Sequence, residues 1–383
     1  MSAPASPSSR SSIISPWVDA LAIGGLSLLL FVPLLLTGRK DLILVSPGAQ
    51  AAIAALVNMP HFLASYRMVY RSKDMVLRHK WAAIYIPLIL GLYIAVAIWQ
   101  SQYSPALVTI LLLVSSSYLA WHYTGQAWGM MATYAYLDGN PFHPTERRFI
   151  RGGLRILLAW HVIWFLHYAN LGFNLGLIYK VVTWLTLLGL ALGAVGLHLQ
   201  RKRTGRLPPM KALIAWGAIF AWYALMARDP RAIFWVQIAH AVQYLIFPIR
   251  VEINRTVKAS PTHVWRHMAF YLGLLLLASW FMSHQLPAAA MTMIARAIGD
   301  QPGQFTPMMI LAFLNIHHYF TDGVIWKISN PEVRKDLFAH VGRNDGTTEE
   351  PAPSNARGRK EDGRTGKPAP SAARGADRQK RKR

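Results

Sequence analysis

Apolar runs about twenty positions long recur along the chain, and short polar segments separate them. A helix of about twenty residues crosses the hydrocarbon core of a bilayer. The pattern therefore predicts an all-α fold, a polytopic transmembrane helical bundle of about ten spans. The expected spans are 17–37, 47–70, 81–100, 104–130, 150–168, 176–199, 209–227, 231–249, 265–283 and 305–327.

Connections rich in lysine and arginine alternate with connections that have few or none, and this pattern predicts how the chain is oriented in the membrane. The segments after the second, fourth, sixth and eighth spans are basic, whereas 100–104 and 169–174 hold neither residue. Basic loops face the cytoplasm. We therefore expect an even number of spans, both termini in the cytoplasm, and a location in the bacterial inner membrane. The basic segments hold Arg71, Lys73, Arg78 and Lys80; Arg147, Arg148 and Arg151; Arg201, Lys202, Arg203 and Arg206; and Arg250, Arg255 and Lys258.

Composition supports a membrane protein, since 53% of the 383 residues are hydrophobic and only 15% are charged. The formal net charge of +23 comes from loops and the C-terminal tail. That distribution favours contact with anionic membrane lipids over a specific nucleic-acid partner. Cysteine is absent, which excludes disulfides, thiolate metal sites and cysteine nucleophiles. Nothing in the sequence sets the oligomeric state.

Four regions are expected. Residues 1–15 are rich in serine and predict a disordered N-terminus, followed by the transmembrane domain at 16–330. Residues 331–343 form a cytoplasmic juxtamembrane segment. Residues 344–383 are rich in Pro, Gly, Ala, Arg and Lys without apolar periodicity, which predicts a disordered basic tail.

Four expected spans each carry a histidine between two polar residues at helical spacing. Residues three and four apart share one helix face, and polar faces inside a membrane turn toward the bundle interior. We therefore expect a shared polar cavity with His61, His122, His240 and His318 as metal ligands. The stripes are Asn58–His61–Ser65, Tyr118–His122–Gln126, Gln237–His240–Tyr244 and Asn315–His318–Asp322.

Neutral imidazoles without thiolates suit Fe, Zn, Cu or Mn. Asp322 would pair with His318 or bind the metal, and we take Asp322 and Tyr244 as candidate catalytic residues. Like Asp322, four residues of the stripes would accept the second N–H of the imidazoles and orient the rings: Ser65, Tyr118, Gln126 and Tyr244. A single membrane histidine can instead bond a helix carbonyl and have only a structural role.

Two further histidines have two readings each. His317 lies about 100° around the helix from His318, so it is either a ligand from the adjacent face or a packing residue. His161 has apolar neighbours at helical spacing and is either a fifth ligand or a packing residue.

Other features have structural interpretations. Gly24-Gly25 and the pair Gly125 and Gly129 are typical of close helix packing in membranes. Asp19, near the start of the first span, would cap that helix or pair with a loop arginine.

Two motifs carry a resemblance to a known family. The Pro60-His61 pair, and the Ser-rich run that leads into His122-Tyr123-Thr124-Gly125, resemble the bacterial Brp/Blh carotenoid-cleaving dioxygenases. The resemblance covers much of the membrane domain. It implies a four-histidine non-haem iron centre that activates oxygen against a lipophilic polyene, with His61, His122, His240 and His318 as ligands.

A buried histidine site also favours a substrate that is itself lipid-soluble. We therefore expect a membrane oxygenase or oxidoreductase with non-haem iron that acts on a lipophilic small molecule, an isoprenoid or a lipid. The paired histidine clusters of two-metal desaturases are absent, which favours one metal. Two alternatives remain open: a transporter or proton-coupled carrier in which Asp322 titrates, and a protein that binds haem or another transition metal.

Overall fold

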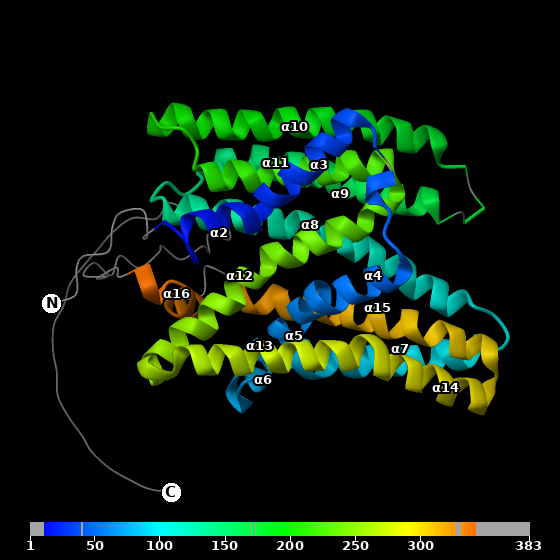
Figure 1. The fold of residues 1–383 in the computed structure, drawn as a ribbon. Helices are drawn as coiled ribbons and strands as arrows, with labels where there is room; N and C mark the ends of the chain where they lie inside the picture. The colour runs from blue at the N-terminus through cyan, green and yellow to red at the C-terminus, as the bar shows by residue number, and fades with distance from the viewer. Residues whose placement is uncertain (1–10, 40, 170, 173, 327–330, 342–383) are drawn as a thin grey trace, which may run out of the picture. The chain divides into compact units, whose positions relative to one another are not determined.

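The computed structural model describes residues 11–39, 41–169, 171–172, 174–326 and 331–341. In these residues the chain is helical with no strand, which confirms the all-α class. The long helices run side by side in Figure 1. The α-helices of the described chain are α2 (Pro16–Ala20), α3 (Leu26–Thr37), α4 (Pro47–Ile53), α5 (Met59–Val69), α6 (Lys73–Arg78), α7 (Ile86–Gln100), α8 (Ala106–Leu137), α9 (Pro144–Tyr168), α10 (Gly176–Thr204), α11 (Met210–Arg228), α12 (Ile233–Ala259), α13 (Val264–Trp280), α14 (Leu286–Ile298), α15 (Asp300–Ile325) and α16 (Pro331–Leu337).

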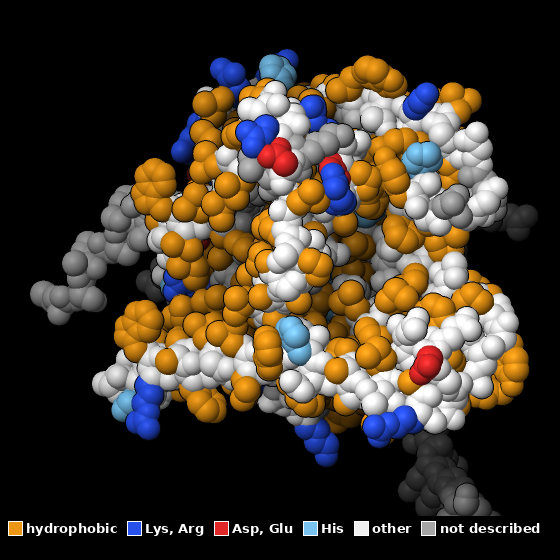
Figure 2. Space-filling view, turned by 45° about the vertical axis from the view of Figure 1, so that its right-hand side comes forward, with side chains coloured by type: hydrophobic (Ala, Val, Ile, Leu, Met, Phe, Trp, Pro, Cys, Tyr) orange, Lys and Arg blue, Asp and Glu red, His pale blue; other side chains and the backbone are white. Residues whose placement is uncertain are grey.

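Eight helical stretches of the described chain are long and apolar enough to cross a membrane. Hydrophobic side chains are spread over the face in Figure 2, which shows few acidic groups. Both observations indicate an integral membrane protein. The stretches are Pro16–Thr37, Trp81–Gln100, Ala106–Leu137, Pro144–Tyr168, Gly176–Thr204, Met210–Arg228, Pro230–Ala259 and Pro261–Ile298.

Two of the ten expected spans are helical but are not among these eight. One runs through α4 and α5, and the other is α15. These helices carry His61 and the pair His317–His318. Their polar residues lower the mean hydropathy of the helices that supply half of the histidine cluster described below.

The connection expected at 283–304 is wrong, because that segment is helical. The chain continues from α13 through a π-helical turn (Phe281–Gln285) into α14, and α15 then folds back against α14. The chain reverses at Gly299, whose φ of 108° is a backbone conformation that residues other than glycine rarely adopt. At Gly303 an added Cβ would lie 2.8 Å from the Cβ of Ala295, so the two helices touch closely.

Three of the four π-helical turns in the described chain end two residues before a proline. The prolines are Pro60, Pro87 and Pro287. A proline lacks the N–H of a regular helix, and its ring crowds the carbonyl four residues earlier. A π turn relieves this contact by widening the helix locally. In the wider turns some backbone carbonyls can accept hydrogen bonds from side chains, as the Ala82 carbonyl does just before α7.

A row of glycines joins α9 to α10. A Cβ added at Gly153 would lie 2.2 Å from the carbonyl oxygen of Gly189, and one at Gly196 would lie 2.8 Å from the carbonyl oxygen of Glu146. Backbones approach this closely only where side chains are absent. This contact fixes α9, which contributes Arg151 to the cavity described below.

The two glycine pairs that were expected to pack closely differ from each other in the structure. Gly24, with φ of 142°, lies against α11, where an added Cβ would come 2.4 Å from the Cβ of Ala218, so close packing is confirmed there. The same expectation is wrong for Gly125 and Gly129, since a Cβ at either position would meet nothing within 4 Å. These two glycines leave open space beside α8.

The chain before α2 is held by Asp19, which is fully buried. Its carboxylate accepts hydrogen bonds from the N–H groups of Ile13 (2.6 Å) and Ile14 (2.9 Å) and from the hydroxyl of Tyr134 (2.9 Å). The expected disorder is therefore wrong for residues 11–15, because a buried carboxylate needs these donors. Residues 1–10 and the expected tail at 344–383 lie outside the described residues.

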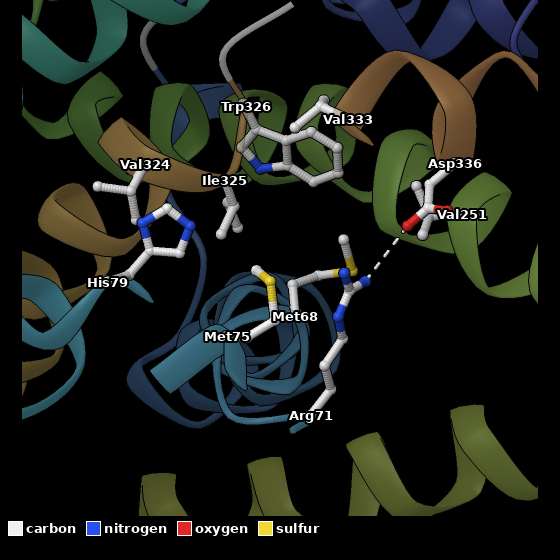
Figure 3. Close-up of a pocket in the computed structure, with 10 residues that line it drawn as sticks. All are labelled: Met68, Arg71, Met75, His79, Val251, Val324, Ile325, Trp326, Val333 and Asp336. Atoms are coloured by element: carbon white, nitrogen blue, oxygen red, sulfur yellow. Dashed lines mark hydrogen bonds and ion pairs between the residues drawn. The ribbon is translucent and has the colours of Figure 1, made fainter. Parts of the chain in front are cut away.

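The juxtamembrane segment forms α16 and packs on the bundle. Asn254 Nδ2 donates to the carbonyls of Asp336 (2.9 Å) and Leu337 (3.1 Å). The Asp336 carboxylate pairs with Arg255 and with Arg71, whose NH1 lies 3.4 Å away (Figure 3). These bonds hold α16 against α12 and Arg71.

Gly153→Ala tests the contact between α9 and α10. The added methyl group would force the two backbones apart, so we expect a loss of about 1–3 kcal/mol and a lower Tm in detergent. Gly152→Ala is the matched control, because its nearest atom, Cδ1 of Leu192, lies at 3.8 Å. This control should keep or raise the Tm, since alanine favours a helix by about 1 kcal/mol over glycine. An unchanged Tm for Gly153→Ala would contradict the packing.

Candidate metal centre

Four helices bring four histidines together in the interior. His61 comes from α5, His122 from α8, His240 from α12 and His318 from α15, and all four are buried. The ring centroids of His61 and His318 lie 4.7 Å apart, as do those of His122 and His240. The rings of His122 and His318 are 5.0 Å apart. The four histidine rings thus face one another in one site.

The hydrogen bonds of His61 and His318 orient their free nitrogens. Nδ1 of His61 donates to the carbonyl of Asn58. The Ser65 hydroxyl donates to the Phe62 carbonyl (2.7 Å), so at 2.9 Å from Nδ1 of His318 it accepts that N–H. Nε2 of each ring is buried and has no hydrogen-bond partner among the described residues. Both tautomers therefore leave an Nε2 lone pair free, as a metal ligand requires.

Nε2 of His122 and Nε2 of His240 lie 3.0 Å apart. Two nitrogens bound at right angles to one ion, each at about 2.1 Å, would have about this separation. Nδ1 of His240 is buried and has no partner among the described residues. The pair therefore suits either one shared proton or a shared ion.

Asp322 completes the cluster with a carboxylate. Its Oδ2 lies 3.3 Å from Nε2 of His318 and 3.9 Å from Nε2 of His122. Its Oδ1 accepts a hydrogen bond from the Tyr244 hydroxyl at 2.9 Å, and that hydroxyl accepts one from Nε1 of Trp326 at 2.8 Å. The chain from Trp326 through Tyr244 orients the carboxylate and leaves Oδ2 directed at the imidazoles.

The donor set fits a transition metal. Each of His61, His240 and His318 offers a ligand atom within 4.8 Å of the other two, and His122, His318 and Asp322 form a second such group. Two nitrogens on opposite sides of one ion lie about 4.2 Å apart, so a small inward shift would close either group. Imidazole and carboxylate ligands without sulfur suit iron, zinc, copper or manganese. The two groups share His318, which lies at the centre of the cluster.

His317 and His161 lie outside this cluster. Nε2 of His317 donates to the carbonyl of Ala82 at 3.0 Å, and its ring stacks on Tyr66. The Ala82 carbonyl belongs to the π turn before Pro87, which frees it for a side chain. His161 bonds through Nδ1 to the Tyr223 hydroxyl at 3.0 Å. Both histidines therefore join neighbouring helices.

Of the four residues expected to support the rings, Ser65 and Tyr244 contact the cluster. Gln126 instead donates to the carbonyl of His240 and to the side chain of Gln243. Tyr118 stacks on Trp121 and not on a cluster histidine.

Sequence reasoning missed the aromatic residues that enclose the cluster. Tyr319 stacks on His122 with ring centroids 4.5 Å apart, and Tyr123 lies 4.5 Å from His240. Trp326, four residues after Asp322, was also missed. Adjacency to a ligand histidine was the signal for both tyrosines, and helical spacing from Asp322 was the signal for Trp326.

A cavity of about 320 Å³ adjoins the cluster. His122, Asp322 and Tyr244 form its inner end, so the cluster is open to a ligand from one side. Most of the remaining wall is apolar or aromatic. The lining includes Trp121, Trp128, Met130, Phe247, Tyr319 and Leu337.

No family model, curated protein or solved structure matches the chain. Fold and site together define a class: an integral membrane protein with apolar helices around a buried histidine–carboxylate cluster and an adjoining apolar cavity.

Ser65→Ala tests the orientation of His318. Without the acceptor hydroxyl, the ring can adopt the other tautomer, so we expect metal affinity to fall about 10- to 100-fold. Competition with a chromophoric chelator measures this. Thr124→Ala is the control, because that hydroxyl bonds the Ala120 and Trp121 carbonyls of its own helix. Equal affinity in Ser65→Ala and wild type would rule out the assigned tautomer.

Proposed function

We propose that this protein is a metal-dependent membrane oxygenase that acts on a lipophilic substrate. The observation that supports it is the convergence of four buried histidines and the Asp322 carboxylate at the end of an apolar cavity. Ionisable groups in a membrane interior are costly and mark functional sites. Non-haem iron is the metal that we propose.

The spacing of the rings favours a bare ion over haem. A porphyrin held by two axial imidazoles needs space for a macrocycle between them. The four rings instead contact one another, with centroids 4.7 to 5.5 Å apart. A single bound ion requires only a small shift of the side chains.

Bound iron would supply activation of molecular oxygen. The reaction we propose is cleavage of a carbon–carbon double bond with O₂ as the oxidant. One oxygen atom enters each of the two carbonyl products, so the substrate supplies all the electrons and no additional reductant is consumed. The described residues hold the substrate and the ligand set: Tyr244 and Trp326 fix Asp322, while the aromatic wall excludes water and orients an apolar chain.

The resemblance to the Brp/Blh dioxygenases supports the same proposal. It names His61, His122, His240 and His318, and these four rings are the ones in contact in the fold. We further propose about ten spans with both termini in the cytoplasm of a bacterial inner membrane. The alternation of basic connections supports this orientation.

Metal content of purified protein tests the proposed centre. We expect about one iron per chain in wild type and background levels in His318→Ala and His240→Ala, because each variant removes a ligand from the cluster. His284→Ala is the matched control, since this histidine lies outside the cluster, in the π turn after α13, and bonds the Trp280 carbonyl. Elemental analysis after anaerobic preparation with iron supplied measures the content.

Three results would contradict the centre. Wild-type protein could stay metal-free, both ligand variants could retain wild-type iron, or the purified sample could show a Soret band, which would indicate haem. Proton flux in liposomes that Asp322→Asn abolishes, without oxygen chemistry, would favour a carrier.

Oxygen uptake tests the reaction. With a lipophilic polyene as substrate, one O₂ should disappear for each double bond cleaved, because both oxygen atoms enter the products. The rate in His318→Ala should equal the rate without protein, whereas His284→Ala should match wild type. Uptake that His318→Ala leaves unchanged, or cleavage without O₂, would overturn the proposed reaction.

A further inference from the structure

The cavity beside the metal cluster follows α8 away from the site. Its lining on that helix starts at Trp121 and His122 and continues to Thr133. Eleven residues separate His122 from Thr133, which corresponds to about 16 Å along the helix axis. The cavity is therefore a channel with the metal cluster at one end.

Three glycines line the channel. Gly125 and Gly129 lie one helical turn apart on α8, Gly323 lies on α15, and an added Cβ at any of the three would meet nothing within 4 Å. A methyl group at these positions would therefore extend into empty space. The width of the channel thus depends on the absence of side chains at these three positions.

A cation lies beside the channel away from the cluster. Arg151 of α9 lines it, and the guanidinium carbon of Arg151 lies 5.9 Å from the ring centroid of Trp128. Among the residues that the structure describes, no carboxylate forms an ion pair with Arg151. Its side chain is exposed, whereas the lining toward His122 is largely apolar. The channel therefore has the metal-binding cluster at one end and a cation beside it, at the level of Trp128.

We propose that the channel binds a single-chain amphiphile with an anionic head, the head at Arg151 and the apolar chain along α8 toward His122 and Asp322. The proposal deepens the proposed function and rests on it, because it names the substrate class of that metal centre. An arginine recognises a carboxylate or a phosphate through charge-assisted hydrogen bonds.

The dimensions support one chain. A volume of about 320 Å³ is at the lower end of the range for ligand pockets, so it suits one acyl or isoprenoid chain better than a two-chain phospholipid. Trp128, which contacts Arg151, lies six residues beyond His122, or about 9 Å along the axis. The reacting bond would therefore be several bonds from the head, at a distance that Arg151 sets.

Binding of three radiolabelled C16 probes to purified, metal-loaded protein in neutral detergent tests the proposal. The probes are palmitate, hexadecyl phosphate and hexadecanol, and a scintillation proximity assay measures saturable binding. We expect at least one of the two anions to bind about tenfold or more tighter than the alcohol. The tighter of the two anions identifies the head group. Equal affinity of the alcohol and both anions would overturn the proposal.

Variants of Arg151 and Gly129 test the binding of the head group and of the apolar chain separately. Arg151→Gln should weaken the preferred anion about tenfold and leave hexadecanol unchanged, whereas Arg151→Lys should retain most of the preference. Arg148→Gln is the matched control, since this exposed arginine lies one turn earlier on α9 and does not line the channel. Gly129→Phe should abolish binding of all three probes by filling the channel, and Gly129→Ala should retain it. Anion binding that both Arg151→Gln and Gly129→Phe leave intact would overturn the proposal.

Metal content measured on the same samples separates the two proposals. Metal-loaded wild type without binding that depends on Arg151 would overturn the amphiphile alone. Metal-free wild type that still binds the anion through Arg151 would overturn the metal centre and leave the anionic channel intact.

Discussion

The fold depends on burying four imidazoles and a carboxylate inside an apolar bundle. An unpaired buried polar group costs about 1–3 kcal/mol, and a lipid interior offers no water to pair with it. Hydrogen-bond partners offset this cost: the Asn58 carbonyl for His61, the Ser65 hydroxyl for His318 and the Tyr244 hydroxyl for Asp322. The ring nitrogens that remain unpaired point to a bound ion as the last partner.

The surrounding architecture serves the same requirement. The helices that carry His61 and His318 are too polar to count among the eight apolar spans, and apolar helices enclose them. Proline-linked π turns release backbone carbonyls that take side-chain donors, as Ala82 does from His317. On the open side, Gly125 and Gly129 leave a channel to the cluster. Closed packing on one side and open space on the other give the site one direction of access.

Much of this could be predicted from the sequence. Helical spacing placed His318 beside Asp322, and it separated His318 from His317, because one residue turns the helix by about 100°. Gly125 and Gly129 could not be interpreted correctly, since glycines that admit a neighbouring helix and glycines that leave space look the same in a sequence. The helix at 286–298 was missed because its polar neighbours and Gly299 resembled a loop. Tertiary packing decided both cases.

X-ray absorption spectroscopy of the metal-loaded protein most directly tests whether one ion joins the four rings. A shared centre predicts a nitrogen and oxygen shell near 2.1 Å with multiple scattering from four imidazoles. In His61→Ala that scattering should fall by one ring, because each helix supplies one ligand. A spectrum without imidazole scattering, or one that His61→Ala leaves unchanged, would contradict the shared centre.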